Sequence, residues 1–482
     1  MRDTSGLRAG AYWKTITPPL GVELSGYGFY LNRKATEIQR PLSALALVLE
    51  QGEERVAIIT ADLLAVSAEM TAKTRAMVSK MTTIPEENVV VACSHTHSGP
   101  ATVFIRGCGE VDSDYANLLP RYLASAVIEA EKQLEEVGVY VGKSHLEGLA
   151  QNRVDPHGAV DTEIQVVELL GHEGGNSHLL ISFGCHPVHT LANDTAVSPD
   201  FMAGARDILE RNYDSVHFLQ GSCGDINPVN AHTNLSGQAR SAQMLAGAAL
   251  IAAGQATEVV NLSPLRCLRR TVELPLNIPS REALEAKRDE NRRLAEERDP
   301  ESPPGRYARF QVEATESLLG QLTGESDPWL EILRDAQEEV SKKTGREPRL
   351  NELATVMDLP PDAVMRLLQL QQVHGASGHL APQTLSCELQ AVRIGDIALL
   401  AHPTELFAEF GLELKANSPF PHTLIVGYAN DFLGYVPNEA DFARQGYAAD
   451  TVPSMLDLFP FASNVGRVFT EASLQLLHAL HT

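Results

Sequence analysis

The sequence predicts an α/β protein in which mixed β-sheets are covered by helices, and three observations support this fold class. Strand-like and helix-like stretches alternate through roughly the first 260 residues, as expected of a layered α/β fold. The composition is globular, with 44% apolar and 21% charged residues. Apolar strand patterning returns at residues 384–401. We therefore expect one large domain over residues 1–482 rather than a row of separate domains.

The first part of the chain supplies strands and helices in turn. Residues 42–49 (LSALALVL) and 55–61 (RVAIITA) have the composition of paired strands, and helical spacing follows at 66–80. The apolar run at 89–93 (VVVAC) predicts a buried strand, and 114–134 has the pattern of an amphipathic helix.

The alternation then continues as far as residue 254. Strands are predicted at 163–170 and 178–184, and a further strand at 215–219 (SVHFL) separates two helical stretches, 201–212 and 236–254. These helices are expected to cover the faces of the sheet.

The middle of the chain has a different character. After a predicted strand at 268–276, residues 280–372 are almost continuously helix-forming and rich in charge, and Ser280 is placed to cap the first helix. We interpret 280–380 as a mostly helical insertion between two strands of the main domain. Its expected role is a lid or a pocket wall over the functional site.

One part of this insertion, residues 342–370, resembles the helix-turn-helix of sigma-factor-like DNA-binding modules. Helix pairs of this length recur widely, and the chain as a whole is acidic. We therefore interpret the segment as two short helices that pack on the rest of the protein. The alternative is a ligand-sensing regulator, which would show salt-dependent DNA binding without metal-dependent turnover.

Charge and targeting signals limit the partners and the location. The formal charge is −23, which argues against nucleic acids and anionic membranes as partners. The N-terminal segment lacks the apolar run of a signal peptide, and no stretch is apolar enough to cross a membrane. The six cysteines include no CxxC pair. We expect reduced thiols, a cytoplasmic location and a chain that is compatible with a homo-oligomer.

Polar residues that suit metal chemistry follow five predicted strands. The five clusters are Ser94–Pro100 (SHTHSGP), Phe183–His189 (FGCHPVH), Gln220–Pro228 (QGSCGDINP), His402–Glu405 (HPTE) and Tyr428–Tyr435 (YANDFLGY). A single histidine among them could equally be a hydrogen-bonded core residue. Because ligands of α/β sheets gather outside the carboxyl ends of strands, the five clusters together indicate a site.

The residue types in these clusters point to zinc. Two imidazoles and one carboxylate form a common catalytic zinc set, which leaves a position for an activated water. We predict a zinc hydrolase with a site at the strand ends, whose expected ligands are His95, His186 and Glu405. His97 stands two residues beyond His95 and points to the same face of an extended chain. His97 therefore either reaches the same metal or contacts the substrate.

The ordered motifs resemble those of the neutral/alkaline ceramidases, zinc amidases that cleave the N-acyl bond of ceramide. The likeness runs from about residue 9 (AGAYWKTITPPLGVELSGYG) to about residue 450 and is least evident through 280–380. It implies that His95 of HTHSGP and His186 of HPVH bind Zn²⁺. Glu405 of Pro403-Thr404-Glu405 and Tyr435 would complete the ligand set.

The same resemblance assigns further active-site residues. His97 of HTHSGP and Arg153 of the Asn152-Arg153 pair are expected to act on the substrate. Tyr447 stands twelve residues beyond Tyr435, where the family has a further active-site tyrosine.

Three departures from the family bear on the substrate. The serine that contacts the ceramide head group is replaced by Asn227, in the segment that also contains Asp225, and both residues are candidates for substrate binding. We expect neither the secretory signal nor the C-terminal immunoglobulin-like domain of true ceramidases. The insertion 280–380 can also reshape the pocket. The substrate is therefore expected to be a small-molecule or lipid-like N-acyl compound, and a smaller one fits as well as ceramide.

Together these residues predict a reaction. Zn²⁺ lowers the pKa of a bound water towards ~7, and the hydroxide attacks an amide carbonyl. His97, Arg153 and Tyr447 stabilise the oxyanion or move protons to the leaving amine. A zinc-dependent esterase or lactonase that uses the same water is the main alternative. A degenerate, inactive relative is a third interpretation, which only the change at Asn227 favours.

Overall fold

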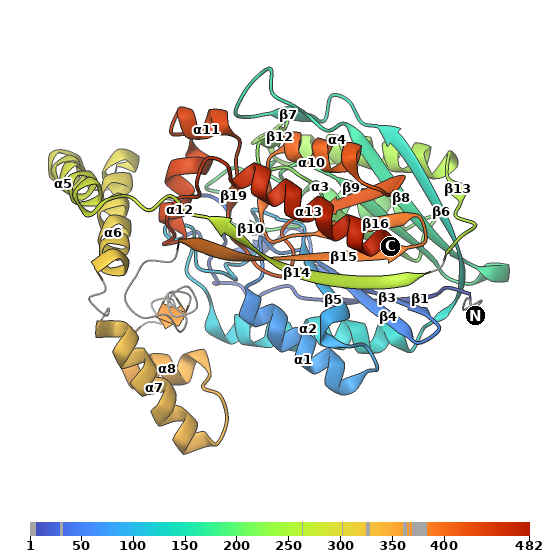
Figure 1. The fold of residues 1–482 in the computed structure, drawn as a ribbon, viewed down its shortest axis with the longest axis horizontal. Helices are drawn as coiled ribbons and strands as arrows, with labels where there is room; N and C mark the ends of the chain where they lie inside the picture. Colours follow the sequence, from blue (N-terminus) through green and yellow to red (C-terminus); the bar gives the residue numbers. More distant parts are fainter. Residues whose placement is uncertain are drawn as a thin grey trace.

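The structure of the protein is a computed structural model, which describes residues 6–28, 32–262, 264–300, 302–323, 328–359, 364–365, 367–368 and 383–482. It confirms the predicted fold class. Two mixed β-sheets pack face to face, and helices cover the outer face of each sheet (Figure 1). The described chain therefore forms four layers, with one apolar core between the sheets and others beneath the helices.

The larger sheet has nine strands in the order β11-β9-β8-β6-β1-β3-β4-β5, and β13 pairs with β6. Its strands are β1 (Arg8–Thr15), β3 (Ser43–Gln51), β4 (Glu54–Ala61), β5 (Val89–Cys93), β6 (Glu135–His145), β8 (Glu163–Gly171), β9 (Ser177–Phe183), β11 (Ser215–Gln220) and β13 (Thr257–Glu258). The β4–β5 and β9–β11 pairs are parallel, and the other pairs are antiparallel.

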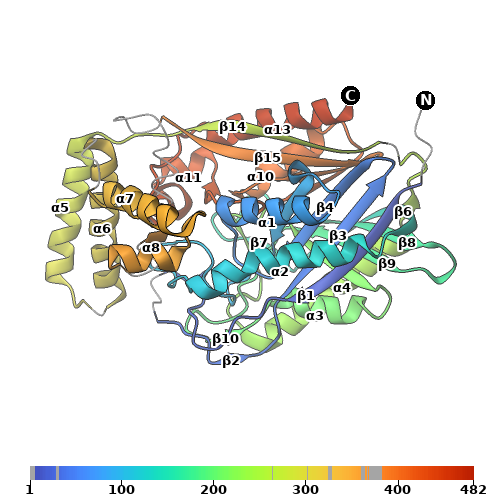
Figure 2. The same cartoon turned by 90° about the horizontal axis from the view of Figure 1, so that it is seen from below.

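The larger sheet is buried on both faces, which explains the continuous apolar run at 42–49. In β3, Ala46 and Val48 pack beneath the helices α1 (Ala68–Met81) and α2 (Ser113–Glu131), whereas Leu47 and Leu49 belong to the core between the sheets. A strand buried on both faces loses its polar alternation. Figure 2 shows α1 and α2 side by side along this face.

The central strands β1 and β6 are the ones that sequence patterning did not single out. Each contains a glycine where a helix approaches closely, and such a glycine interrupts the apolar pattern of a strand. A Cβ on Gly10 of β1 would lie 2.4 Å from the carbonyl oxygen of Ala130 in α2. A Cβ on Gly142 of β6 would lie 2.0 Å from that of Ala252 in α4 (Asn234–Gly254).

The smaller sheet has four strands in the order β14-β15-β16-β18. They are β14 (Leu265–Pro275), β15 (Thr384–Ile394), β16 (Ile397–Ala401) and β18 (His422–Val426). Helices α10 (Ala408–Asn417) and α13 (Val465–His481) lie over its outer face, while α3 (Phe201–Leu209) and α4 cover the β8–β9–β11 part of the larger sheet.

Three two-stranded ladders connect the loops near the strand ends. They pair β2 (Glu37–Ile38) with β10 (Ala196–Val197), β7 (Ala150–Asn152) with β12 (Ile226–Pro228), and β17 (Glu405–Leu406) with β19 (Tyr435–Val436). The last ladder brings Glu405 and Tyr435 into register.

The segment between β14 and β15 is helical in its described part. Helices α5 (Arg281–Glu297), α6 (Pro303–Thr323), α7 (Pro328–Thr344) and α8 (Leu350–Met357) gather at one end of the molecule (Figures 1 and 2). Asn351 of α8 donates a hydrogen bond of 2.5 Å to Asp114 of α2. Much of the second half of the predicted helix-turn-helix lies outside the described residues, including 360–363, 366 and 369–370.

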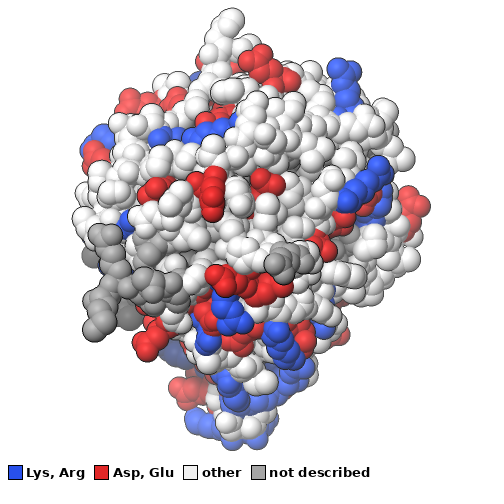
Figure 3. Space-filling view, turned by 90° about the vertical axis from the view of Figure 1, so that its right-hand side faces the viewer, with Lys and Arg blue, Asp and Glu red and all other residues white. Residues whose placement is uncertain are grey.

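On the face of the molecule in Figure 3, acidic and basic side chains lie next to one another across a largely uncharged surface. This mixed distribution differs from the continuous basic stripe that tracks a nucleic-acid backbone. None of the helices in the described part of the chain is long and apolar enough to cross a membrane.

Candidate active site

The loops that follow β5, β9, β11, β16 and β18 meet between the two sheets. Backbone hydrogen bonds connect them: Cys93 N donates to Tyr428 O at 3.1 Å, and Gly427 N donates to Gln220 O at 2.8 Å. The short bridge between Ala92 and Ala429 joins the two sheets at this edge. The five predicted clusters are therefore neighbours in space.

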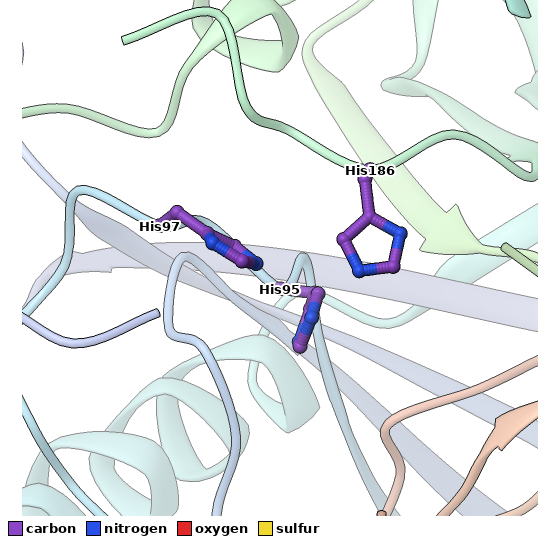
Figure 4. Close-up of side chains that lie close together, drawn as sticks. All are labelled: His95, His97 and His186. Carbon is purple, nitrogen blue, oxygen red and sulfur yellow. The ribbon is translucent and has the colours of Figure 1, made fainter. Parts of the chain in front are cut away.

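Three histidine rings converge at this meeting point. His95 and His97 come from the loop after β5, and His186 comes from the loop after β9 (Figure 4). One ring nitrogen of each lies within 4.8 Å of those of the other two, and all three residues are buried. His95 has a positive φ of 64°, a conformation that a non-glycine residue rarely adopts.

Backbone carbonyls fix the tautomers of two of these rings. His95 Nδ1 lies 3.0 Å from Leu64 O, and His186 Nδ1 lies 2.6 Å from Cys223 O. Since a carbonyl oxygen only accepts hydrogen bonds, both Nδ1 atoms must donate, and in the neutral imidazoles both Nε2 atoms present lone pairs. Each Nε2 lies 3.3 Å from Glu405 Oε2.

This donor set fits a metal cation. Two imidazole lone pairs face the same carboxylate oxygen, an arrangement that a cation between them would stabilise. Burial lowers the pKa of His186 to about 3, so this ring is neutral at pH 7. Protonation of His186 therefore does not relieve the repulsion between its Nε2 lone pair and Glu405 Oε2. Both nitrogens of His97 are also buried, with no hydrogen-bond partner among the described residues.

Glu405 supplies the negative charge of this centre. Burial disfavours its ionised form, but the neighbouring His95 and His186, where they carry positive charge, outweigh that effect and hold the pKa of Glu405 well below its usual range. A bound metal cation would act in the same direction, so this carboxylate suits metal coordination.

Arg153 brings a permanent positive charge beside the histidines. Its Nη2 donates to Tyr435 Oη and to Gly224 O, both at 2.7 Å, and it lies 3.4 Å from His186 Nε2. Its Nη1 donates to Asn227 Oδ1 at 3.3 Å. These contacts hold the guanidinium in one orientation.

A cavity of about 260 Å³ opens above these groups. His95, His97, Glu405, Arg153 and Asn227 supply part of its polar lining, and Leu64, Ile105, Val188, Val452 and Met455 supply apolar walls. Tyr435 and Tyr447 also line it, with their rings 6.1 Å apart. Tyr447 begins a short π-helical turn, Tyr447–Thr451.

Asp225 lies behind the cavity wall. Its two carboxylate oxygens accept hydrogen bonds from Ala408 N at 2.7 Å and from Asn152 Nδ2 at 2.6 Å, and Arg153 N donates to Asp225 O at 2.8 Å. The predicted metal and catalytic residues other than His186 line one cavity together with Asn227, and His186 contacts Glu405. Asp225 supports the loop that carries Arg153.

Sequence patterning missed two aromatic residues of the site. Tyr428 stacks on His95 with a ring separation of 3.9 Å, and its hydroxyl donates to Glu405 Oε2 at 3.4 Å. Tyr27 packs against His97 at 5.1 Å and donates to Thr190 O at 2.7 Å. Tyr428 is the first residue of the fifth polar cluster, so its position in the sequence could have identified it as a site residue. Tyr27 has no sequence spacing that relates it to the histidines.

His189, the last residue of HPVH, belongs to a separate buried network. Its Nδ1 lies 2.6 Å from Asp200 Oδ1, and its Nε2 lies 2.8 Å from Ser241 Oγ. The order of groups is that of a Ser-His-Asp triad, but His189 and Ser241 are almost completely buried. We assign the network a structural role, because a substrate could not reach the serine.

Gly26 fixes the position of His97, which leads to a first prediction. Gly26 has a φ of +105°, and a Cβ at this position would lie 2.5 Å from His97 Cγ. We expect Gly26→Ala to displace the His97 ring and to lower turnover by about 100-fold, the scale of a small misplacement of a reacting group. Gly21→Ala is a matched control, because Gly21 has a φ of +95° and open space around it. Equal turnover in the two variants would contradict this role of Gly26.

The fold and the site define a class of layered α/β protein with a buried histidine–carboxylate centre at the ends of its strands. The family model for the neutral/alkaline non-lysosomal ceramidase, N-terminal part, matches residues 9–264, which is more than half of the chain. The chain belongs to this family, as the ordered motifs predicted, and the membership identifies it as a hydrolase.

Solved structures agree with this assignment at the level of the fold. The chain is similar to the neutral ceramidase from Pseudomonas aeruginosa, with 19% identity and a TM-score of 0.68 over 99% of this chain and 75% of that one. It is also similar to a structure described as ceramidase complexed with C2, with 18% identity and a TM-score of 0.69 over the same shares of the two chains.

Proposed function

We propose that the protein is a zinc-dependent amidase that cleaves the N-acyl bond of a compound smaller than ceramide. The observation that carries this proposal is the convergence of two imidazole lone pairs, from His95 and His186, on the Glu405 carboxylate at 3.3 Å. Two histidines and a carboxylate are a recurrent set for catalytic zinc. Tyr435, which lies beside Glu405, would be the fourth ligand. When bound, zinc supplies a Lewis acid that makes a water nucleophilic at neutral pH.

Three further side chains would act on the substrate. Burial lowers the pKa of His97 well below its ordinary value, so the ring is neutral and has a nitrogen lone pair that can accept a hydrogen bond. We assign His97 to proton transfer because it lines the cavity beside His95. Arg153 is always cationic and is placed to stabilise negative charge on the carbonyl oxygen. Tyr447 is half exposed, and a tyrosine hydroxyl is protonated at neutral pH, so it can donate a hydrogen bond to the substrate.

The size of the cavity supports a small N-acyl substrate. Its volume of about 260 Å³ is just below that of most small-molecule sites, which occupy roughly 300–1,000 Å³. The apolar walls at Leu64, Ile105 and Met455 suit a short acyl chain. Asn227 is engaged with Arg153, and we assign it to substrate binding through its remaining amide hydrogens.

We also propose that the insertion 280–380 acts as a pocket wall. Phe310 of α6 packs in the same apolar cluster as Ile105, Val452 and Met455, which line the cavity. Lys287 of α5 forms an ion pair of 3.4 Å with Asp450, in the π-helical turn that begins at Tyr447. The helices would therefore support the cavity wall from outside.

The test of this function combines metal analysis with matched substrates. We expect about one zinc ion per purified chain, loss of activity after chelation and recovery when zinc is returned. N-hexanoylethanolamine should be cleaved faster than a long-chain ceramide or than ethyl hexanoate, with release of the free acid as the readout. A metal-free protein that keeps its full rate would refute zinc dependence. Faster cleavage of the ester would favour the esterase or lactonase alternative.

A further inference from the structure

A second cavity, of about 380 Å³, lies next to the catalytic one. We call it the rear cavity. Phe432 lines both cavities, and its ring lies 6.3 Å from that of His95. The start of α1, strands β14 and β15 and the segments around 430–433 and 456–458 form the other walls. Its volume is within the range of small-molecule sites.

Most charged groups of the rear cavity are already paired. Glu388 accepts hydrogen bonds from both terminal nitrogens of Arg75, at 3.2 and 2.8 Å, and from Arg269 at 3.1 Å. The Asp457 carboxylate is paired with Arg106 at 2.5 Å. Arg75 also donates to Gln390 and to Val89 O, so little of its hydrogen-bonding capacity is left for an anionic ligand.

Asp431 is the exception. Its Oδ1 accepts a hydrogen bond of 2.9 Å from Ala68 N, but no Lys or Arg of the described chain pairs with this carboxylate. Burial raises the pKa of Asp431 to about 6, which still leaves the group mostly ionised at pH 7.5. The rear cavity therefore presents one negative charge without a cationic partner.

The rest of the lining is amphiphilic. Hydroxyl groups are contributed by Ser67, Thr271, Thr384 and Ser386, and apolar side chains by Val103, Phe104, Leu433, Leu456 and Leu458. A ligand that matches this wall carries a positive charge for the carboxylate and an aliphatic part for the leucines.

We propose that the rear cavity binds a small amphiphilic amine, whose ammonium group pairs with Asp431 and whose aliphatic chain packs along Phe432 and Leu456. Hydrolysis of an amide by water gives a carboxylic acid and an amine of this chemical class. That link to the reaction rests on the proposed function, whereas the binding of an amine does not. Asp431 is thus a binding residue for an amine beside the catalytic centre.

Binding of n-octylamine at pH 7.5 to the purified full chain tests this proposal by calorimetry. We expect octylammonium to bind at least 10-fold more tightly than octan-1-ol and octanoate, which carry the same chain with no charge or with the opposite charge. Asp431→Asn keeps an acceptor for Ala68 N and should weaken octylammonium binding at least 10-fold. Asp396→Asn, at an exposed turn, should leave it unchanged.

A second variant keeps the test valid if Asp431→Asn does not fold. Ser386 is exposed at the edge of the rear cavity, so Ser386→Trp should narrow it and weaken octylammonium binding while leaving Asp431 in place. Unchanged octylammonium affinity in the folded Asp431→Asn or Ser386→Trp protein would overturn the proposal, as would equal affinity for octan-1-ol. Failure of the proposed function would appear separately, as metal-independent or absent amidase turnover.

Discussion

His186→Ala is expected to remove the metal and, with it, the amidase activity. His186 supplies one of the two imidazole lone pairs that face Glu405, and its Nδ1 is held by Cys223 O at 2.6 Å. Loss of a group that only supports a ligand typically costs 10–100-fold in metal affinity, so loss of the ligand itself should cost more than about 100-fold. Metal content after dialysis and kcat/KM for the hexanoyl amide should fall together.

The matched control for this variant is His402→Ala. His402 follows a strand as His186 does and is equally buried, but it contacts Thr404 and the ring of Phe469 rather than the metal residues. We expect His402→Ala to lower the free energy of unfolding and to leave metal content unchanged. Full metal occupancy and full turnover in His186→Ala would contradict the ligand assignment.

His97→Gln is expected to lower kcat by about 100- to 10,000-fold while the metal is retained. This is the usual contribution of a positioned acid or base, and glutamine cannot exchange a proton in the same way. The measurement is kcat and metal content in parallel, because His97 lies close enough to His95 and His186 to be a ligand instead. Burial lowers the pKa of His97, which keeps the ring neutral at pH 7.

Two outcomes separate the roles of His97. If His97→Gln loses both the metal and the activity, His97 is a metal ligand, and Glu405 supports the ligands instead of binding the metal. Retained metal with unchanged kcat would remove His97 from the mechanism. As a control, His232→Gln changes another histidine that lines the cavity, one whose ring is not part of the cluster, and it should have a much smaller effect on kcat.

The pattern of apolar residues predicted many of the strands and helices, because the periodicity of a strand or helix is contained in its own residues. The run 42–49 became β3, and the helix expected at 114–134 became α2, Ser113–Glu131. The patterning missed β1 and β6, where Gly10 and Gly142 allow helix backbones to approach. Glycine is needed at these two positions because α2 and α4 pack against them. Both helices are distant in sequence from the strands, so the local residue pattern does not indicate the contact.

The residue types of the site were also available from the sequence. Histidines and a glutamate after apolar strands, in the order of a known family, were sufficient to name His95, His186 and Glu405. A position after a strand does not by itself separate these histidines from His402, which also follows a strand but faces the core beside Phe469. The direction of a side chain depends on the packing around it, and that packing comes from other parts of the chain.

The sequence by itself therefore determined the fold class, the family and the chemical groups that the site contains. Only the tertiary structure decided which ring nitrogen of His95 and of His186 faces Glu405, because Leu64 O and Cys223 O hold the other nitrogen of each ring. It also decided the volume of the catalytic cavity and placed the rear cavity beside it, across Phe432. These properties depend on contacts between segments that are far apart in the chain, and residue patterning reports only on near neighbours.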